Sequence, residues 1–442
     1  MSIISVFDNM KKIKIVTLGC DKNLVDSEML AGRLSEKFEL SPDFEDGEAV
    51  VINTCGFIGD AKKQSVEAIF SAVREKNEGK FRKVLVTGCL IERYYDEMKK
   101  EIEEVDGFFR LGDFEEMAKF FSIGSPAPVE PYRERIALES SHYSFIKISD
   151  GCNQKCSYCA IPGIRGRYIS RTVESICSEA EFMINSGVKE VILVGQEISS
   201  YGKDLYKKRM ISHLLKELSK ICGKKAWIRL LYTHPYLVDR EFIETVAQHE
   251  NICNYIDLPV QHTRTEILRS MGRRDTTDSL YTKIRMIREI IPDIAIRTSI
   301  ITGFPGETVK VFNCLKKDIS ELRFDRLGVF PFSKEEGTRA FGMQGQISRK
   351  TAEKRASGVM DIQREISYEN NSKLVGTVQT VLIDRIEGQY SAGRTYRDAP
   401  DVDNEVFCEK KLKPGKFCRV KIVRADDYDL YGEFLSEMTF PF

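Results

Sequence analysis

GCNQKCSYC, residues 151–159, places Cys152, Cys156 and Cys159 in a C-x3-C-x2-C run. A cubane 4Fe–4S cluster normally binds four thiolates, so three cysteines at this spacing predict a cluster with one iron open to a ligand. The same logic separates catalytic zinc sites from structural ones. A structural zinc site would need a fourth Cys or a His nearby, and none follows Cys159 within the next dozen residues. The motif therefore predicts an iron–sulfur cluster that takes part in chemistry.

The strand-like segment YSFIKIS, residues 143–149, ends just before this motif and is the first of six such segments. Helical patterns separate them, and one of these, residues 172–187, has Thr172 as its expected N-cap. Six βα units predict a partial barrel with its chemistry on the loops that follow the strands, where the motif lies. The other five segments are residues 190–198, 226–233, 255–261, 294–303 and 326–333.

A second group of three cysteines is dispersed along the first ninety residues. Cys20, Cys55 and Cys89 each close an apolar run of strand type, in residues 12–20, 48–55 and 83–89, with amphipathic helical patterns between the runs. Alternation of this kind predicts a parallel sheet, and ligands bind outside the carboxyl ends of its strands. The three thiolates are therefore expected to converge on a second open cluster. The alternative is that each is a small buried hydrophobe.

Beyond the barrel pattern the sequence changes character. Residues 347–374 form one long helical pattern, and residues 375–442 contain short strands and turns that predict a small antiparallel barrel. Before the barrel pattern, a proline-rich and charged stretch reads as a linker. The predicted fold class is thus α/β, with a parallel-sheet N-terminal domain, a partial (βα)6 barrel and a small C-terminal antiparallel β-barrel.

Composition narrows the function classes. The 442 residues carry 67 Lys and Arg against 67 Asp and Glu, so no global basic field indicates nucleic-acid binding. This length favours two or three domains. No apolar run approaches the roughly 18 residues of a membrane span, so no membrane partner is expected. Twelve cysteines with open-cluster spacing fit a reducing cytoplasm better than a disulfide framework.

The C-x3-C-x2-C run, with Tyr158 before its last cysteine, resembles the signature of the radical S-adenosylmethionine enzymes. The resemblance implies that S-adenosylmethionine binds the open iron and that one electron from the cluster cleaves it to a radical. It also implies cofactor contacts by Tyr158, by Gln196 after the second strand, and by Gly303 and Gly306 in TGFPGET after the fifth. The alternatives are a tight turn for the glycines and a solvated strand-end amide for Gln196.

LGCDKNLVDSE, NTCGFI and TGC, which carry the dispersed cysteines, stand before the radical-type triplet and resemble the methylthiotransferases. The resemblance covers nearly the whole chain. It implies a cluster domain (12–124), a linker (125–141), a radical core with a bridging helix (142–374) and a TRAM domain (375–442). It further implies that Cys20, Cys55 and Cys89 bind an auxiliary 4Fe–4S cluster that carries the sulfur, while Cys152, Cys156 and Cys159 bind the radical 4Fe–4S cluster.

Within that family, GCDKNLVDSE, NTCGFIGDAKKQS and SAGRTYRDAPDVDN (residues 391–404) resemble the branch that methylthiolates an aspartate β-carbon of small-subunit ribosomal protein twelve. Asp21 departs from the proline usual there, but it is not a ligand. Residues 373–442 carry 11 Lys and Arg against 12 Asp and Glu. A domain that grips RNA phosphates should be basic, whereas a basic ribosomal protein favours acidic patches on its partner.

The resemblance implies a mechanism that uses two S-adenosylmethionine molecules. One donates a methyl group to sulfur at the auxiliary cluster, and the other yields the radical that removes a hydrogen from the aspartate β-carbon. No catalytic side chain beyond the cluster ligands is expected, and an electron donor and a sulfur donor must exist, neither identified by the sequence. The alternatives are the same chemistry on a transfer-RNA adenosine, a two-cluster electron carrier, and a structural-zinc module that binds nucleic acid.

Several other residues carry weaker expectations. Asp398, Asp401 and Asp403 are expected to lie near the contact with the ribosomal protein, and the alternative is an ordinary acidic turn. Arg229 and Arg297 either bind a substrate carboxylate or form salt bridges within the barrel. His262 is expected to be structural.

Overall fold

Five parallel strands form the N-terminal sheet of the computed structural model, which describes residues 10–125, 130–139 and 142–439. Three of them coincide with the runs that the sequence predicted, and they are neighbours, in the order β1, β3, β4. The two short edge strands, β2 and β5, lie outside those predictions. The strands are β1 (Lys11–Thr17), β2 (Phe38–Ser41), β3 (Gly47–Thr54), β4 (Phe81–Gly88) and β5 (Gly107–Phe108).

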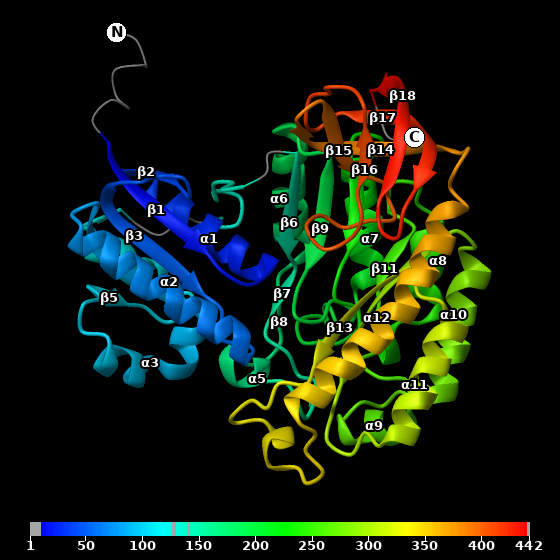
Figure 1. The fold of residues 1–442 in the computed structure, drawn as a ribbon. Helices are drawn as coiled ribbons and strands as arrows, with labels where there is room; N and C mark the ends of the chain where they lie inside the picture. Colours follow the sequence, from blue (N-terminus) through cyan, green and yellow to red (C-terminus); the bar gives the residue numbers. More distant parts are fainter. Residues whose placement is uncertain (1–9, 126–129, 140–141, 440–442) are drawn as a thin grey trace.

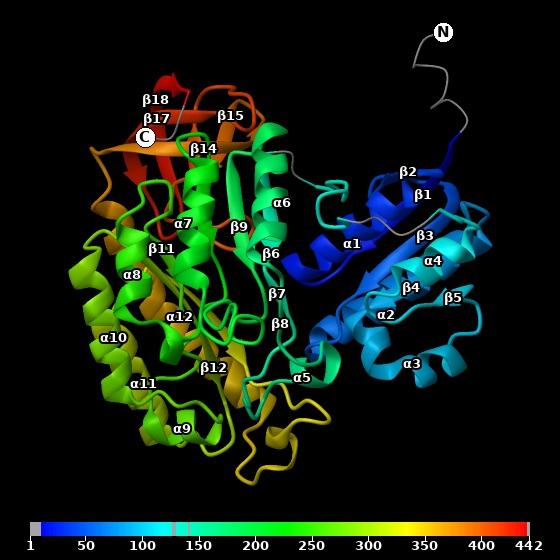
Figure 2. The ribbon, with the colours of Figure 1, turned by 180° about the vertical axis from the view of Figure 1, so that it is seen from behind.

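Helices cover both faces of this sheet, so the N-terminal domain has three layers (Figures 1 and 2). Apolar side chains of α1 and α4 pack with Ile13, Ile15 and Val51 on one face. Side chains of α2 and α3 pack with Val50 and Ile52 on the other. The alternation of Val50, Val51 and Ile52 between the two cores follows from the two-residue period of a strand. The helices are α1 (Asp21–Leu34), α2 (Gly59–Asn77), α3 (Cys89–Glu101) and α4 (Phe114–Phe120).

Six parallel strands form the partial barrel. They pair as β10-β9-β6 and β11-β12-β13, and a bridge between Ile228 and Ile252 connects β10 to the segment just before β11. Around the barrel they therefore follow chain order, as the βα pattern predicted. They are β6 (Tyr143–Lys147), β9 (Glu190–Val194), β10 (Trp227–Leu230), β11 (Tyr255–Asp257), β12 (Ala295–Thr302) and β13 (Arg326–Pro331).

Helices pack outside these strands around one large apolar core. α6 begins at its expected cap, where the Thr172 side chain accepts a hydrogen bond from the Ser175 amide. The helices are α6 (Val173–Asn185), α7 (Ile211–Cys222), α8 (Arg240–Ala247), α9 (Thr265–Ser270), α10 (Thr277–Ile290) and α11 (Val309–Leu322), with 3-10 turns at Pro235–Leu237 and Arg339–Gly342.

A small hairpin-like pair closes the loop that carries the tight cysteine triplet. β7 (Ser149–Asp150) pairs antiparallel with β8 (Ile169–Ser170), and the short helix α5 (Ile161–Ile164) lies between them. Cys152, Cys156 and Cys159 therefore sit on a loop whose two ends are tied together. Figure 1 shows α5 at the side of the barrel that faces the N-terminal domain.

The C-terminal strands form a closed barrel in the order β14-β15-β16-β18-β17. All pairs are antiparallel except β16 with β18. The long helix α12 (Arg349–Ser372) leads to this barrel along the outside of β13 (Figure 1). These observations confirm the predicted fold class. The strands are β14 (Val378–Glu387), β15 (Tyr390–Arg394), β16 (Val406–Cys408), β17 (Phe417–Ala425) and β18 (Leu430–Met438).

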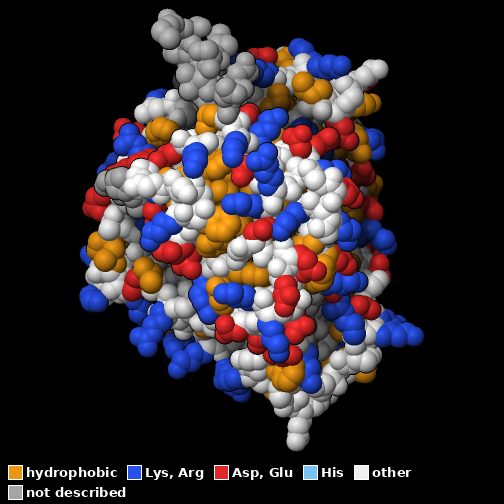
Figure 3. Space-filling model, turned by 90° about the vertical axis from the view of Figure 1, so that its left-hand side faces the viewer, with side chains coloured by type: hydrophobic (Ala, Val, Ile, Leu, Met, Phe, Trp, Pro, Cys, Tyr) orange, Lys and Arg blue, Asp and Glu red, His pale blue; other side chains and the backbone are white. Residues whose placement is uncertain are grey.

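The surface carries charges of both signs. In Figure 3, Lys and Arg side chains are interspersed with Asp and Glu side chains over the face that the view presents, with apolar side chains between them. This mixed pattern agrees with the balanced composition. In the described part of the chain, no helix combines the length and the apolar character needed to cross a membrane.

Candidate iron–sulfur sites

The dispersed cysteines follow three adjacent strands. Cys20 is the N-cap residue of α1, after β1. Cys55 directly follows β3, and Cys89, directly after β4, is the first residue of α3. Their thiols are close enough to interact electrostatically with one another. Two of the thiols thus lie at helix N-termini, whose positive end of the dipole stabilises thiolates.

The amide of Asn23 connects all three cysteine loops. Its Nδ2 donates to the Leu18 carbonyl at 2.7 Å and to the Thr54 carbonyl at 3.1 Å, next to Cys20 and Cys55 respectively. Its Oδ1 accepts the Cys89 thiol at 3.6 Å. Asn23 is fully buried. It therefore fixes the relative positions of the three loops.

Asn53 and Ser65 form further hydrogen bonds with the backbone of the cysteine loops. The Asn53 amide donates to the Asn23 carbonyl at 2.8 Å. The Ser65 hydroxyl accepts from the Cys55 amide and donates to the Cys55 carbonyl, both at 2.9 Å. Sequence reasoning missed all three polar residues, although Asn23 and Asn53 stand within three positions of Cys20 and Cys55 and offered a signal.

Glycine at two positions allows the cysteine loops to pack closely against each other. Gly19 has φ of +100°, and a Cβ there would lie 2.8 Å from Cys55 Cβ and 2.9 Å from Cys55 Sγ. Gly88 has the same φ, and a Cβ there would lie 2.4 Å from Asn53 Oδ1. Both positions combine a left-handed backbone with close approach, which only glycine allows without strain.

Burial disfavours the charged form of these thiols. It raises the pKa of Cys89 to about 12 and raises that of Cys55 above its usual value, and the neighbouring cysteines add to the effect. A metal cluster binds the thiolate form, so each thiol must lose its proton when the cluster is loaded. Without metal, the buried thiols stay neutral. The positive charge of bound iron ions would stabilise the thiolates in this site.

The tight triplet is anchored at its centre by Ser157. The Ser157 amide donates to the Met271 carbonyl and its hydroxyl to the Ser270 carbonyl, both at 2.8 Å. Burial raises the pKa of Cys152 to about 11 and of Cys159 to about 12, with a further rise from the nearby thiols. The three cysteines thus lie on one loop between β7 and β8.

Among the described residues, no three His, Cys, Asp or Glu side chains lie close enough to one another to share one metal ion. In a cubane cluster each thiolate binds a different iron, so its ligands stand farther apart than those of a single tetrahedral zinc. Both triplets are compatible with such a cluster: their cysteines have buried or half-buried side chains, and they lie on a single loop in the tight triplet and at one edge of the sheet in the dispersed one.

Polar atoms without partners lie at the ends of the barrel strands near the tight triplet. Both amide atoms of Gln196 are buried without a hydrogen bond, as are Oε2 of Glu197 and Nδ1 of His234. Burial and the cations Arg273 and Arg274 lower the pKa of His234 to about 2, so this imidazole is neutral. Such a set fits a polar ligand with donor and acceptor groups. Glu197 and His234 were not predicted, since a single carboxylate or imidazole after a strand carries little signal.

Two of the predicted cofactor contacts have other partners as well. Tyr158 lies in an apolar cluster beside Phe304, with its hydroxyl 3.4 Å from Arg273 Nη1. A Cβ at Gly303 would lie 2.3 Å from Ala352 Cβ, so packing of α12 requires this glycine. Gly306 has φ of +87° and open space beside it. Close packing against α12 thus explains a glycine at residue 303 without any cofactor, while the side-chain amide of Gln196 is buried and therefore not a solvated one.

The weaker candidates among the basic residues are structural. Arg229 is fully buried and pairs with Glu190 at 2.5 Å. Arg297 pairs with Asp257 at 2.9 Å. His262 is fully buried, with Nε2 3.5 Å from Glu307 Oε2. The salt-bridge alternative thus holds for both arginines.

Of the three aspartates expected near the contact with the ribosomal protein, Asp398 and Asp403 have buried side chains and do not present their carboxylates to a partner. Asp398 is buried and pairs with Arg326 at 2.6 Å, and Asp403 accepts from the Tyr255 hydroxyl at 2.7 Å. Their segment, residues 395–404, fills the end of the barrel where the strands begin. Only Asp401 is exposed, where it accepts from the Tyr143 hydroxyl at 3.1 Å. These carboxylates are buried because they pair with arginines of the barrel strands. The sequence around the aspartates gives no indication of these distant partners.

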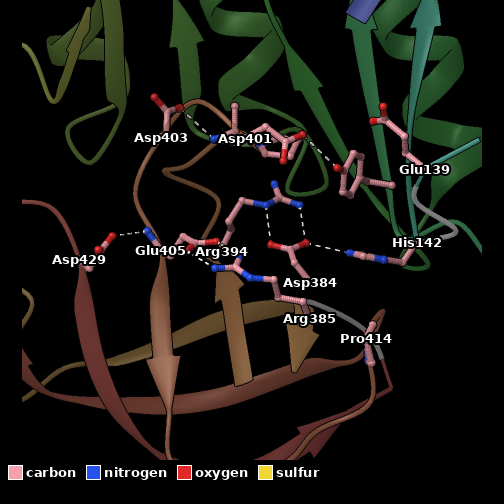
Figure 4. A pocket seen from close by; sticks show the side chains of 13 residues that line it. Glu139, His142, Asp384, Arg385, Arg394, Asp401, Asp403, Glu405, Pro414 and Asp429 are labelled. Carbon is pink, nitrogen blue, oxygen red and sulfur yellow. Dashed lines mark hydrogen bonds and ion pairs between the residues drawn. The ribbon is translucent and has the colours of Figure 1, made fainter. Parts of the chain in front are cut away.

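A charged cavity of about 840 Å³ lies at this same end, between the C-terminal barrel and the start of β6. In Figure 4, Asp384 stands between Arg394 and His142, and Arg385 points to Glu405. The cysteines lie beyond the other end of β6. This cavity is therefore separate from the candidate cluster sites.

The two cysteine triplets face each other across the domain boundary. Arg165, six residues after Cys159, donates to Asn23 Oδ1 at 2.7 Å. From the barrel, the Tyr232 hydroxyl donates to Asp21 Oδ2 at 2.8 Å, and the Lys22 ammonium lies 3.3 Å from the centre of its ring. On the N-terminal side, the boundary is thus lined by residues next to Cys20. On the other side, it is lined by the tight-triplet loop and by the end of the barrel where the strands terminate.

Comparison with known families divides the chain in three. Residues 12–110 match the uncharacterized protein family UPF0004, residues 146–313 the radical SAM superfamily, and residues 375–435 the TRAM domain. Curated relatives match nearly end to end. The ribosomal protein uS12 methylthiotransferase RimO of Acetivibrio thermocellus is 42% identical over 97% of this chain and 99% of its own. The protein of the same name from Thermotoga maritima is 41% identical over 96% of this chain and 100% of its own.

Solved structures share the fold at low identity. The radical S-adenosylmethionine methyltransferase TsrM from Kitasatospora setae aligns with a TM-score of 0.54 and 16% identity, over 85% of this chain and 79% of its own. The cobalamin-dependent S-adenosylmethionine radical enzyme OxsB aligns with a TM-score of 0.50 and 10% identity, over 80% of this chain and 56% of its own. At such identities the likeness concerns the fold alone.

Proposed function

The chain belongs to the RimO family of ribosomal protein uS12 methylthiotransferases, and we propose that it transfers a methylthio group to the β-carbon of an aspartate in uS12. The observation that carries the proposal is the meeting of two three-cysteine sites across one domain boundary. A carrier of electrons alone would need four protein ligands for each cluster. A three-ligand site leaves one iron of each cluster free for a reactant.

We propose that Cys20, Cys55 and Cys89 bind the auxiliary 4Fe–4S cluster, and that Cys152, Cys156 and Cys159 bind the radical 4Fe–4S cluster. With S-adenosylmethionine bound, the radical cluster supplies the one-electron chemistry that an unactivated C–H bond requires, because such a bond offers no proton for a general base. Two molecules of S-adenosylmethionine are used for each product, one for the methyl group and one for the radical.

The chain's own residues would bind and orient the cofactor. The unpaired amide of Gln196, the free oxygen of Glu197 and the neutral His234 would meet its polar groups. Gly306 leaves backbone room, and the ring of Tyr158 adds an apolar wall. The cofactor contact expected at Gly303 stays a prediction beside its packing role.

We propose the domain division 12–124, 125–141, 142–374 and 375–442. Parts of the linker, residues 126–129 and 140–141, fall outside the described residues. We also propose a cytoplasmic location, which is supported by six partly accessible or buried thiols that oxidants would consume. The protein needs an electron donor and a sulfur donor in that compartment.

Iron counting tests the two-cluster assignment. The anaerobically reconstituted chain should hold about eight irons, four for each cubane. Cys152→Ala should remove about half of the iron and abolish reductive cleavage of S-adenosylmethionine. Cys89→Ala should also remove about half, yet leave cleavage intact. Cys222→Ala is the control, since Cys222 is buried in the barrel core. Loss of both clusters from a single change would contradict the assignment.

Mass spectrometry tests the substrate. Ribosomal proteins and transfer RNA would be compared from cells that contain the active chain and cells that contain the Cys152→Ala variant. A methylthio group should appear on an aspartate of uS12 only with the active chain. If it appears instead on transfer-RNA adenosine, with uS12 unmodified, the alternative substrate is the correct one.

A further inference from the structure

Arg165 extends from the radical core into the N-terminal domain. It follows α5 on the loop of the tight triplet, and its side chain is 1% exposed. Its Nη2 donates to Asn23 Oδ1 at 2.7 Å and to Asp26 Oδ2 at 2.8 Å, both on α1. Its Nη1 donates to the two oxygens of Asp150 at 3.2 and 3.1 Å. One side chain thus connects the tight-triplet loop to the helix that Cys20 caps.

The surrounding charges are balanced. Lys147 also pairs with both carboxylates, contacting Asp26 closely and Asp150 at 2.9 Å. Two cations and two carboxylates therefore form a quartet in which each carboxylate has two cationic partners; Lys147, Arg165 and Asp26 are buried, and Asp150 is half-buried. Lys147 by itself forms ion pairs with both Asp26 and Asp150. The hydrogen bond from Arg165 to Asn23 is therefore not required to neutralise the charges of the quartet.

That extra bond is directed at the auxiliary site. The oxygen that Arg165 contacts, Asn23 Oδ1, is the same atom that accepts the Cys89 thiol. When Cys89 binds iron, its Sγ loses the proton that it donates. Asn23 Oδ1 then keeps Arg165 as its donor, so the amide that joins the three cysteine loops stays in place. The guanidinium is also a fixed positive charge close to Cys89, because both groups contact the same oxygen atom.

We propose that Arg165 is a positioning residue of the auxiliary cluster: it orients Asn23 and, through its buried charge, raises the reduction potential of that cluster. The inference rests on the proposed assignment of Cys20, Cys55 and Cys89 as ligands. Reduction adds negative charge to a cluster, and a fixed cation nearby stabilises the reduced form. The auxiliary site is therefore completed by a side chain from the loop of the other cluster.

A redox titration of the auxiliary cluster alone tests the proposal. In the full-length Cys152→Ala/Cys156→Ala/Cys159→Ala variant, reconstituted anaerobically with iron and sulfide, the midpoint potential would be followed by electron paramagnetic resonance. Adding Arg165→Gln should make one-electron reduction at least tenfold less favourable, about 59 mV more negative. Arg165→Lys, which keeps the charge, should shift the potential by less than half as much. Asp150→Asn, which removes a nearby negative charge, should shift it in the opposite direction.

Arg33→Gln is the matched control. Arg33 is a buried arginine on the same helix, but it pairs with Glu115 at 2.9 Å and has no contact with a cysteine loop among the described residues. Its potential should equal that of the parent variant. The proposal would be overturned if Arg165→Gln, Asp150→Asn and Arg33→Gln had equal midpoint potentials. It would also be overturned if Arg165→Gln and Asp150→Asn shifted the potential in the same direction. If Arg165→Gln fails to fold, the potentials of Arg165→Lys and Asp150→Asn provide the test. A parent variant without iron would instead refute the ligand assignment.

Discussion

Single residues around the dispersed cysteines decide whether three thiols can share one cluster. The thiols come from loops separated by more than thirty residues, so contacts between backbones, rather than chain connectivity, set their spacing. Gly19 shows this most directly, because a Cβ at residue 19 would lie only 2.8 Å from the Cβ of Cys55, closer than two such carbon atoms can approach.

Gly19→Ala should therefore empty the auxiliary site. The new Cβ would displace Cys55, and iron per chain should fall from about eight to about four. Gly79→Ala is a matched control: Gly79 has a similar φ of +80° but nothing within 4 Å of its Cβ position. Both variants carry the same kind of backbone strain, so only the clash differs. Equal iron content in the two variants, measured after identical reconstitution, would show that the close approach at Gly19 is unimportant.

At the scale of elements, the segment that joins β15 to β16 closes the barrel where its strands begin. Arg394, at the end of β15, pairs with Glu190 of β9 at 2.7 Å, and Glu190 also pairs with Arg229 of β10. All three side chains are nearly inaccessible to water. Glu190 thus pairs with buried guanidinium groups from two different domains; Arg394 has Asp384 as a second carboxylate partner, whereas Arg229 has Glu190 alone among the described residues.

Glu190→Gln should destabilise the fold strongly. It leaves Arg229 without its carboxylate in a dry environment, a change that typically costs about 3–5 kcal/mol. Denaturant unfolding of the metal-free chain, followed by circular dichroism, would measure the loss. Glu217→Gln, which removes an exposed partner of Lys220, should leave the transition unchanged. Similar transitions for the two variants would mean that the buried carboxylate contributes nothing.

The same elements show how far the sequence could lead. Hydrophobic patterning predicted β1, β3, β4 and the six barrel strands, because apolar residues recur along each of these segments and helical patterns separate them. β2 and β5 are short edge strands with little pattern to detect. The cysteine triplets could be predicted because their chemistry is local or follows from strand ends. Arg165 and Asp398 could not, because their partners lie in other domains and only the folded chain brings them together.

At the scale of the whole molecule, a loop after β13 fastens the radical core to the N-terminal domain. Glu335, 2% exposed, pairs with Lys62 of α2 at 2.8 Å and with Arg93 of α3 at 3.0 Å. Arg93 also donates to the Gly56 carbonyl, next to Cys55. Together with the Arg165 contacts, this loop holds the two cysteine sites in one relative position.

The Glu335 contact should weaken in acid. Burial alone would raise the pKa of Glu335, but hydrogen bonds from Lys62, Ser333 and Arg93 lower it below its usual value. Its stabilisation is therefore complete above the unfolded-state pKa, roughly 4.3, and is lost as pH falls through the lower folded-state value. Hydrogen exchange of α2 in the metal-free chain should accelerate over that range, beyond the intrinsic change in exchange rate.

Glu335→Gln provides the comparison. Its α2 should exchange faster than that of the unmodified chain at neutral pH, because two cations lose their shared carboxylate. Its protection should then change little as the pH is lowered. If both proteins lose protection in parallel, the carboxylate of Glu335 does not govern the docking of the two domains.

The closure of the barrel by residues 395–404 has a consequence for how the protein is made. The barrel strands leave the ribosome well before this segment does. Until it arrives, Arg326 lacks the carboxylate of Asp398, and Arg297 lacks that of Asp403. The nascent barrel is thus open to water at one end. That end is covered only when residues 395–404 of the C-terminal domain have been synthesised.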